Sequence, residues 1–322
     1  MKKMAIRLMA AALCLWLLPG NAMAADYLIP VGQVVGLELR NDTVSVAAFD
    51  EVLGSEAKSA GLQIGDEIID IDGKTVDDAQ DVRLALERSD GRVCLRIKRD
   101  DKERELCLTP QITADGPRLG VYLRQGITGI GTVTWYDPAS GAFGTLGHGV
   151  NDAKGELVEM TSGTAYPASV LSVKRGKCGE PGQLRGGVDG QQALGCLEKN
   201  TQSGLFGITE SGWDGKAVEV ASSEEIHTGS ATIRSTINGK EVREYSVEIL
   251  KIYPEKRQEG RNMLIRVTDP ELLAATGGIV QGMSGSPIIQ DGKLIGAVTH
   301  VLVNDPTTGY GIFIENMLDA AA

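Results

Sequence analysis

Apolar and polar positions divide the chain into three stretches of different character. An unbroken apolar run occupies residues 8–18, and residues 28–110 mix short β-rich runs with short helical turns. From residue 121 onward, β-rich runs alternate with Gly, Asn and Asp turns, and helical periodicity is confined to residues 270–276 and 315–321. This pattern predicts a mainly β protein whose second half is a β-barrel or a pair of barrels. The expected strands of that half are 131–135, 168–173, 217–220, 241–252, 263–267, 293–299 and 311–314.

The first half has one clear helix and one clear hairpin. Asp77 or Asp78 is suited to cap a helix that runs through Arg88, because a side-chain carboxylate accepts from the first free N–H groups of a helix. The apolar face of this helix is Ala79, Val82 and Leu86. Residues 92–97 and 104–109 alternate in polarity and predict two strands of a hairpin.

Cysteine positions predict a disulfide on this hairpin. If Asp100-Asp101 forms a two-residue loop, Cys94 and Cys107 lie opposite each other in a non-hydrogen-bonded pair, where Cα atoms approach to about 4.5 Å. That separation permits a bridge, and two free buried thiols are the alternative. Cys178 and Cys196 are candidates for a second bridge in an exported protein, but their spacing specifies no geometry and is not a zinc pattern.

The first segment has the features of a secretory signal. Three cations precede the apolar run, Pro19-Gly20 interrupts it, and Ala22-Met23-Ala24 has the small residues of a signal-peptidase site. We therefore expect residues 1–24 to be a signal peptide that is cleaved after Ala24. An uncleaved membrane anchor is the alternative, although the apolar run is shorter than a comfortable membrane span of about 20 residues.

Composition fits an exported β protein and excludes several other classes. Hydrophobic residues make up 42% of the 322 residues and aromatic residues only 4%, with 41 glycines, which is typical of turn-rich β structure with aliphatic cores. The formal net charge of −11 leaves no basic footprint for nucleic acid. Gly73-Lys74-Thr75 lacks the earlier glycine of a P-loop. We expect no metal and no cofactor.

One hexapeptide near the end of the chain has the composition of an acyl-transfer turn. In Gly282-Met283-Ser284-Gly285-Ser286-Pro287, glycines on both sides of Ser284 permit a sharp bend. Such a bend exposes a serine hydroxyl and directs the N–H groups of Gly282 and Ser284 at one point, which supplies a nucleophile and an oxyanion hole. A plain surface turn before a proline is the alternative, and Ser286 is the rival nucleophile.

Three histidines are available as a general base. His148 lies between Gly147 and Gly149, which leaves its imidazole accessible to another part of the chain. His227 lies in a polar, surface-like stretch, and His300 follows a strand close after the serine turn. We expect His148 to be the base, His227 to be a surface residue, and His300 either to line a specificity pocket or to end a strand.

Residues 55–74 resemble the PDZ domains of bacterial envelope proteases, with a helical turn, a Gly-Asp turn and a strand leading to an Asp-Gly turn. The resemblance implies an α+β PDZ domain over residues 28–110, followed by a linker at 111–120. A PDZ domain binds an extended peptide at a sheet edge, and here Val35, Gly36 and Leu37 would receive the peptide carboxylate. The alternative is a module that only packs against its neighbour.

The order of signal, PDZ domain, Gly-His-Gly turn and Gly-x-Ser-Gly-x-Pro turn resembles the chymotrypsin-like serine proteases, and most closely the stage IV sporulation protein B peptidases. The resemblance implies a serine peptidase domain at 121–322 that uses Ser284, His148 and an orienting acid. The candidate acids between His148 and Ser284 are the four aspartates Asp152, Asp189, Asp214 and Asp269. The family pattern points to Asp269, although an Asp before a proline is also typical of a helix cap or turn.

The same resemblance implies where the protein acts and on what. It implies a protease exported to the space between forespore and mother-cell membranes, which cleaves itself near its N-terminus and then a membrane-anchored sporulation regulator. That cleavage would lead to activation of a late mother-cell sigma factor. Two other functions stay open from the residues alone: a broad quality-control protease of the cell envelope, and a non-catalytic PDZ adaptor with a structural barrel.

Overall fold

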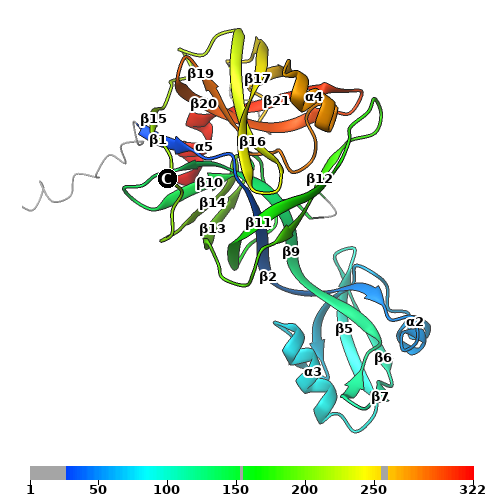
Figure 1. Cartoon of the computed structure of the whole chain (residues 1–322). Coiled ribbons are helices and arrows are strands. Elements are labelled where there is room, and N and C mark those ends of the chain that lie inside the picture. Colours follow the sequence, from blue (N-terminus) through cyan, green and yellow to red (C-terminus); the bar gives the residue numbers. More distant parts are fainter. Residues whose placement is uncertain (1–26, 153–154, 255–259) are drawn as a thin grey trace, which may run out of the picture.

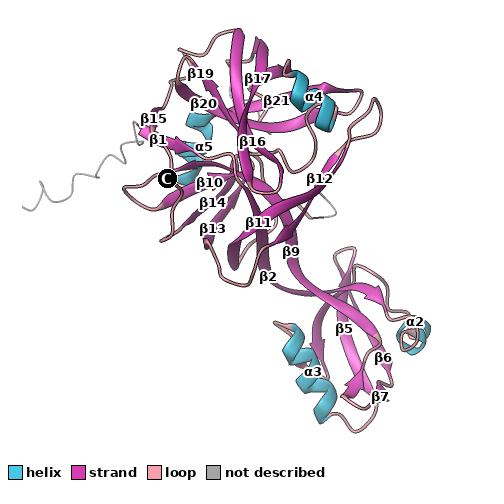
Figure 2. Cartoon of the chain, in the orientation of Figure 1, coloured by secondary structure: helices cyan, strands magenta, loops and turns pink. Residues whose placement is uncertain are grey.

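The computed structural model describes residues 27–152, 155–254 and 260–322, and strands make up most of it (Figures 1 and 2). The expected signal peptide, with its cleavage site after Ala24, lies outside the described residues. No helix in the described part of the chain has the length and apolar character needed to cross a bilayer. Two barrels form one body, and a smaller domain stands apart from it on a two-stranded stalk (Figure 1).

The stalk consists of two long antiparallel strands, β2 (Val34–Phe49) and β9 (Val121–Tyr136). They pair from Val34 opposite Thr132 to Phe49 opposite Val121, with irregularities near the middle. Each strand is 16 residues long, about 50 Å at 3.3 Å per residue. One pair of strands therefore belongs to the barrel at one end and to the small domain at the other.

The first barrel is a closed ring of six strands, because each neighbour pairs in the order β2, β9, β10, β14, β13, β11 and back to β2. Its further strands are β10 (Ala142–Thr145), β11 (Ser162–Lys174), β13 (Gly195–Thr201) and β14 (Gly204–Ile208). The strands β1 (Tyr27–Pro30), β12 (Gln183–Val188) and β15 (Val218–Glu219) extend this sheet at its sides. Mostly aliphatic side chains, together with Phe143, fill its interior, in keeping with the composition.

The second barrel is closed by six strands in the order β16, β17, β18, β21, β20, β19. These are β16 (Gly229–Asn238), β17 (Glu241–Ile252), β18 (Met263–Val267), β19 (Pro287–Gln290), β20 (Lys293–Leu302) and β21 (Asp305–Phe313). Two helices accompany it, α4 (Pro270–Thr276) and α5 (Ile314–Ala321). Both match the helical stretches expected from the sequence. A separate cluster around Trp135, Phe206, Ile312 and Met317 packs the two barrels together.

The small domain has its own buried core of aliphatic side chains. Its elements are α2 (Ser55–Ser59), β3 (Glu67–Ile71), β4 (Lys74–Thr75), α3 (Ala79–Arg88), β5 (Val93–Arg99), β6 (Lys102–Leu108), β7 (Gln111–Thr113) and β8 (Gly116–Arg118). Asp78, rather than Asp77, caps α3, and Asp81 completes a capping box. On the expected face Val82 and Leu86 are buried, whereas Ala79 in the first turn of the helix is exposed.

The structure divides the chain differently from the expected boundaries. Residues 27–39 belong to the first barrel, because β1 pairs with β9 and the first part of β2 pairs with β11. The small domain is therefore inserted between two strands of that barrel instead of preceding it. The expected linker at 111–120 is the β7–β8 hairpin and the entry to β9, and it contributes to a groove of the small domain. The local pattern of apolar residues does not show which partner a strand pairs with. For this reason the start of the PDZ domain was wrongly expected at residue 28.

The hairpin disulfide is confirmed. Cys94 and Cys107 face each other in the β5–β6 ladder and are bonded, with Arg99 opposite Lys102 at the turn. The candidate second bridge is absent, since Cys178 and Cys196 are both free and exposed.

Because the disulfide joins cysteines 13 positions apart in the sequence, removing it with Cys94→Ala/Cys107→Ala should lower the free energy of unfolding of the small domain by up to about 3 kcal/mol. Urea unfolding of the full chain, followed by far-UV circular dichroism, measures the change. Cys178→Ala/Cys196→Ala is the matched control and should leave the curve unaltered. An equal shift in both double variants would contradict the assignment.

Candidate active site

A cavity of about 350 Å³ lies where the two barrels meet. The first barrel contributes Ile130, Leu146 and His148, and the second contributes the turn up to Ser284 and the strand end at Thr299, His300 and Val301. Ser284 and His148, 136 positions apart in the sequence, thus line one space. Both are half-buried, which leaves them accessible from the cavity.

The serine lies on a tight turn between Val280 and β19, in which both flanking glycines have positive φ, +98° at Gly282 and +95° at Gly285. Close packing also requires glycine at 285, since a Cβ there would lie 2.0 Å from the carbonyl oxygen of Thr132. The sequence prediction that glycines shape this turn is confirmed by these angles. Any side chain at 285 would push the two barrels apart at the serine.

Backbone hydrogen bonds fix the direction of the two N–H groups expected to form the oxyanion hole. The carbonyl of Gln281 accepts from Leu184 N at 2.8 Å, and the carbonyl of Met283 accepts from Ser286 N at 3.0 Å. In a planar trans peptide the N–H points opposite to the C=O, so the N–H groups of Gly282 and Ser284 point away from these partners. Within the described residues, neither of these two N–H groups donates to a protein acceptor.

His148 follows β10 on a turn in which Leu146 and Gly147 both have φ of +70°. Its Nδ1 lies 2.9 Å from the carbonyl oxygen of Gly149. A carbonyl oxygen only accepts, so Nδ1 carries the proton and Nε2 of the neutral ring keeps its lone pair. This is the tautomer that a general base needs, because Nε2 is free to take a proton.

Burial lowers the pKa of His148 below its ordinary value of 6.5, and the hydrogen bond to Gly149 opposes this effect only in part. Removing water from around the ring disfavours the charged imidazolium. The imidazole is therefore neutral near pH 7 and able to accept a proton.

The hydroxyl of Ser284 donates to the carbonyl oxygen of Thr299 at 2.8 Å. In this resting arrangement the proton of the hydroxyl is directed at a backbone carbonyl and not at the imidazole. Attack on a substrate requires the hydroxyl to leave that carbonyl and donate to Nε2 of His148. His300 lines the same cavity, with its ring centroid 5.3 Å from that of His148.

Asn200, at the end of β13, holds the turn that carries His148. Its side-chain oxygen accepts from Val150 N at 2.9 Å, and its amide nitrogen donates to the carbonyls of Val150 at 2.8 Å and Val158 at 2.9 Å. Both backbone polar groups of Val150 are thus bound by one half-buried side chain. Because Gly149 connects Val150 to His148, this contact fixes the carbonyl that selects the tautomer. The sequence offered no signal for this role, because an isolated Asn in a strand matches no motif.

The structure does not bring Asp269 to His148. The Asp269 carboxylate caps α4, accepting from Leu272 N at 2.9 Å and Ser246 N at 3.4 Å. It does not line the cavity, and Nδ1 of His148 is bound to a backbone carbonyl instead. The expected orienting acid is therefore corrected: in this structure Asp269 has the helix-cap role that an Asp-Pro pair also favours.

The other acids between His148 and Ser284 also lie outside the cavity lining. Asp152 accepts from Glu156 N, and Asp189 accepts from Ser169 Oγ at 2.9 Å and pairs with Lys240 at 3.1 Å. Asp214 is exposed in a separate crevice. The rival nucleophile Ser286 is fully buried and donates to Ser235 Oγ at 3.0 Å, which leaves Ser284 as the accessible hydroxyl of the turn.

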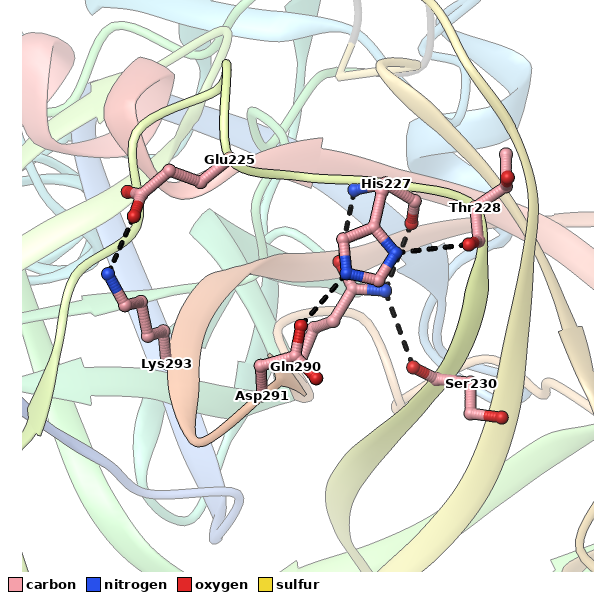
Figure 3. A network of polar contacts seen from close by, with 7 residues as sticks. All are labelled: Glu225, His227, Thr228, Ser230, Gln290, Asp291 and Lys293. Carbon is pink, nitrogen blue, oxygen red and sulfur yellow. Dashed lines mark hydrogen bonds and ion pairs between the residues drawn. The ribbon is translucent and has the colours of Figure 1, made fainter.

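His227 belongs to a surface network on the second barrel (Figure 3). Its Nε2 lies 2.8 Å from an oxygen of Asp291, and its backbone N–H and C=O are both bound by the side chain of Gln290. The carbonyl of Thr228 and the carboxylate of Asp291 raise its pKa. His227 is a surface residue, as the sequence suggested, and it takes no part in the cavity.

The expected carboxylate site of the PDZ domain is also corrected. Val35, Gly36 and Leu37 pair with β11 on one side and β9 on the other, inside the first barrel. Their backbone groups are therefore used by the sheet and face no peptide groove. The assignment failed because these residues precede the small domain in sequence and belong to the barrel in space.

The groove of the small domain lies instead between α3 and the start of β9, with a cavity of about 450 Å³. Its walls include Val82 and Leu86 from α3 and Leu119, Gly120 and Val121 from the segment opposite. At Val121 the strand pairs with β2 on one side, and within the described residues no strand pairs with its other edge there. The sequence feature that could have indicated this groove is Leu119-Gly120-Val121, a glycine between two apolar residues at the start of a strand. It was missed because it overlaps the end of the expected linker at 111–120.

The structure has two closed six-stranded barrels, and the cavity between them is lined by a histidine from the first and a glycine-flanked serine from the second. This is the architecture of the chymotrypsin-like serine peptidases. The chain belongs to the SpoIVB peptidase S55 family, whose model matches residues 116–318, and a PDZ domain model matches residues 51–99. The family resemblance and the domain types expected from the sequence are confirmed.

Two solved structures match parts of this chain at low identity and low TM-score. The Rv3671c protease from M. tuberculosis in its active form has a TM-score of 0.38 and 15% identity, covering 61% of this chain and 75% of that chain. The PDZ domain of the SdrC-like protein from Listeria monocytogenes has a TM-score of 0.23 and 22% identity, covering 27% of this chain and 92% of that chain. No curated protein matches this chain.

The lowered pKa of His148 predicts the pH dependence of the reaction. The proposed reaction needs neutral imidazole, and the folded-state pKa lies below 6.5, so kcat/KM should fall to half of its plateau value at a pH below 6.5. Hydrolysis of p-nitrophenyl acetate between pH 4.5 and 8 measures this acidic limb. An apparent pKa above 6.5 would contradict the assignment of burial as the dominant cause.

Asn200→Ala should lower kcat/KM about 10-fold, because the turn carrying His148 loses three hydrogen bonds of about 1 kcal/mol each and no longer fixes the ring. The acidic limb should also move upward toward 6.5 as water reaches the imidazole. Asn238→Ala, at an exposed position of the second barrel, is the control and should match wild type. A normal pH profile in Asn200→Ala would argue against this role.

Proposed function

We propose that this serine peptidase is an exported regulatory endopeptidase that cleaves itself and then a membrane-anchored regulatory protein during sporulation. The observation that carries the catalytic part is the cavity shared by Ser284, His148 and the two unused N–H groups of the serine turn. The sporulation role is supported by membership of the SpoIVB peptidase family. Export is supported by the leader pattern in residues 1–24.

In the proposed reaction, Ser284 Oγ attacks the scissile carbonyl and His148 Nε2 accepts its proton. The tetrahedral oxyanion is stabilised by the N–H groups of Gly282 and Ser284, whose directions the turn has already fixed. The imidazolium then protonates the leaving amine, and water repeats the sequence on the acyl-enzyme. The carbonyl of Gly149 holds Nδ1–H throughout, as a neutral substitute for the expected carboxylate.

The substrate is a polypeptide in this proposal, and the PDZ groove supports it. An extended peptide can add to the free edge of β9 beside α3, with its apolar side chains against Val82, Leu86 and Leu119. The N–H groups near Gly120 are then the candidates to receive a carboxylate, in place of Val35, Gly36 and Leu37. The chain's own N-terminal segment is the first proposed substrate of the protease site.

Ser284→Ala should fold normally and lose both self-trimming near the N-terminus and labelling by a fluorophosphonate. Purified wild type and variant, incubated alone and mapped by mass spectrometry, measure the trimming. Ser286→Ala is the matched control: its hydroxyl is buried against Ser235, so it should lose about 1 kcal/mol of stability while its labelling persists. Trimming by Ser284→Ala at the wild-type rate, or labelling lost only in Ser286→Ala, would refute the assignment of the nucleophile.

A further inference from the structure

Thr132 lies at the junction of the two barrels and is fully buried. It belongs to β9 in the first barrel, yet its hydroxyl donates to the carbonyl of Gly282 at 2.9 Å and its N–H donates to the carbonyl of Ser284 at 3.1 Å. Both acceptors belong to the serine turn of the second barrel. One residue of the first barrel therefore binds the carbonyls of the two residues whose N–H groups form the proposed oxyanion hole.

The hydroxyl of Thr132 acts on the peptide that lies between those two N–H groups. The Gly282–Met283 peptide has its carbonyl bound by Thr132 and its N–H donated to the carbonyl of Val280 at 3.1 Å. A peptide plane bound at both ends cannot rotate, and its neighbours share its two Cα atoms. Without the hydroxyl, the positive-φ glycine at 282 offers little resistance to rotation, because glycine tolerates most backbone conformations.

Thr132 also reaches the histidine side of the cavity. Its carbonyl accepts from Thr145 Oγ1 at 2.6 Å and from Leu146 N at 3.3 Å. These two residues immediately precede the Gly147-His148 turn. The backbone of Thr132 thus joins the serine turn and the histidine turn. Among the described residues, its hydroxyl donates to the Gly282 carbonyl alone, so a substitution of the side chain separates the two effects.

We propose that Thr132 is a positioning residue whose hydroxyl holds the oxyanion hole in its open geometry. The inference rests on the proposed function, since it concerns the same serine turn. It predicts a defect in the chemical step and not in substrate binding, because Thr132 is fully buried and is not among the described residues that line the cavity. A hydrogen bond of this kind controls the orientation of a whole oxyanion donor. The effect of removing it on the rate should therefore lie between the effect of losing one ordinary hydrogen bond and that of losing one oxyanion donor.

Thr132→Val removes the hydroxyl and keeps the branched shape and the backbone bonds. It should lower kcat for p-nitrophenyl acetate, and the rate of fluorophosphonate labelling, by roughly 10- to 100-fold, with KM changed less than about three-fold. Thr134→Val is the matched control, since Thr134 is equally buried on the same strand and its hydroxyl donates to the carbonyl of Gly285 at 2.8 Å. It should stay within about three-fold of wild type.

If Thr132→Val does not fold, a second pair of variants tests the same inference. Thr132→Ser and Thr132→Ala both lose the methyl group and differ in the hydroxyl, so the inference requires that serine restores kcat and alanine does not. Equal kcat in Thr132→Ser and Thr132→Ala, or equal losses in Thr132→Val and Thr134→Val, would overturn the inference while wild type remains active. Wild type that neither reacts with the fluorophosphonate nor hydrolyses the ester would overturn the proposed function and this inference with it.

Discussion

The ladder between β2 and β9 is the constraint on which the rest of the structure depends. Its hydrogen bonds close the first barrel, form the stalk, and supply two strands of the PDZ sheet. Because β9 continues into the barrel, Thr132 on it lies against the serine turn, while Val121 at its other end lines the groove of the small domain. Sheet pairing that is non-local in sequence thus sets the positions of both functional sites.

Elements whose evidence is local were predictable from the sequence. The α3 helix, the Cys94–Cys107 hairpin and the glycines of the serine turn were each indicated by a pattern spanning no more than about a dozen residues, and the structure has all of them. The pairing of Val35, Gly36 and Leu37 with β11 depends on a strand more than 120 residues away. Alternation of apolar residues indicates which face of a strand is buried, but not which strand lies beside it. The predicted domain boundary at residue 28 and the predicted carboxylate site were therefore wrong.

Site residues divide in the same way. Ser284 and His148 could be proposed as candidates because both have glycines beside them, and the fold brings both to one cavity. Asp269 was misleading because a carboxylate before a proline fits a catalytic acid and a helix cap equally well, and only the fold distinguishes them. Thr132 and Asn200 were missed because their roles consist of hydrogen bonds to backbone groups, which no residue pattern records.

The use of backbone groups at His148 has an energetic consequence. A carboxylate beside Nδ1 would stabilise the imidazolium by a full opposite charge, whereas the carbonyl of Gly149 offers only a dipole, and burial outweighs it. The tautomer is still correct, so proton transfer is possible, but the charged intermediate gains less stabilisation than in a triad with an acid. In the proposed reaction, stabilisation of the transition state then depends more heavily on the oxyanion hole, whose donors lie on the turn that Thr132 binds.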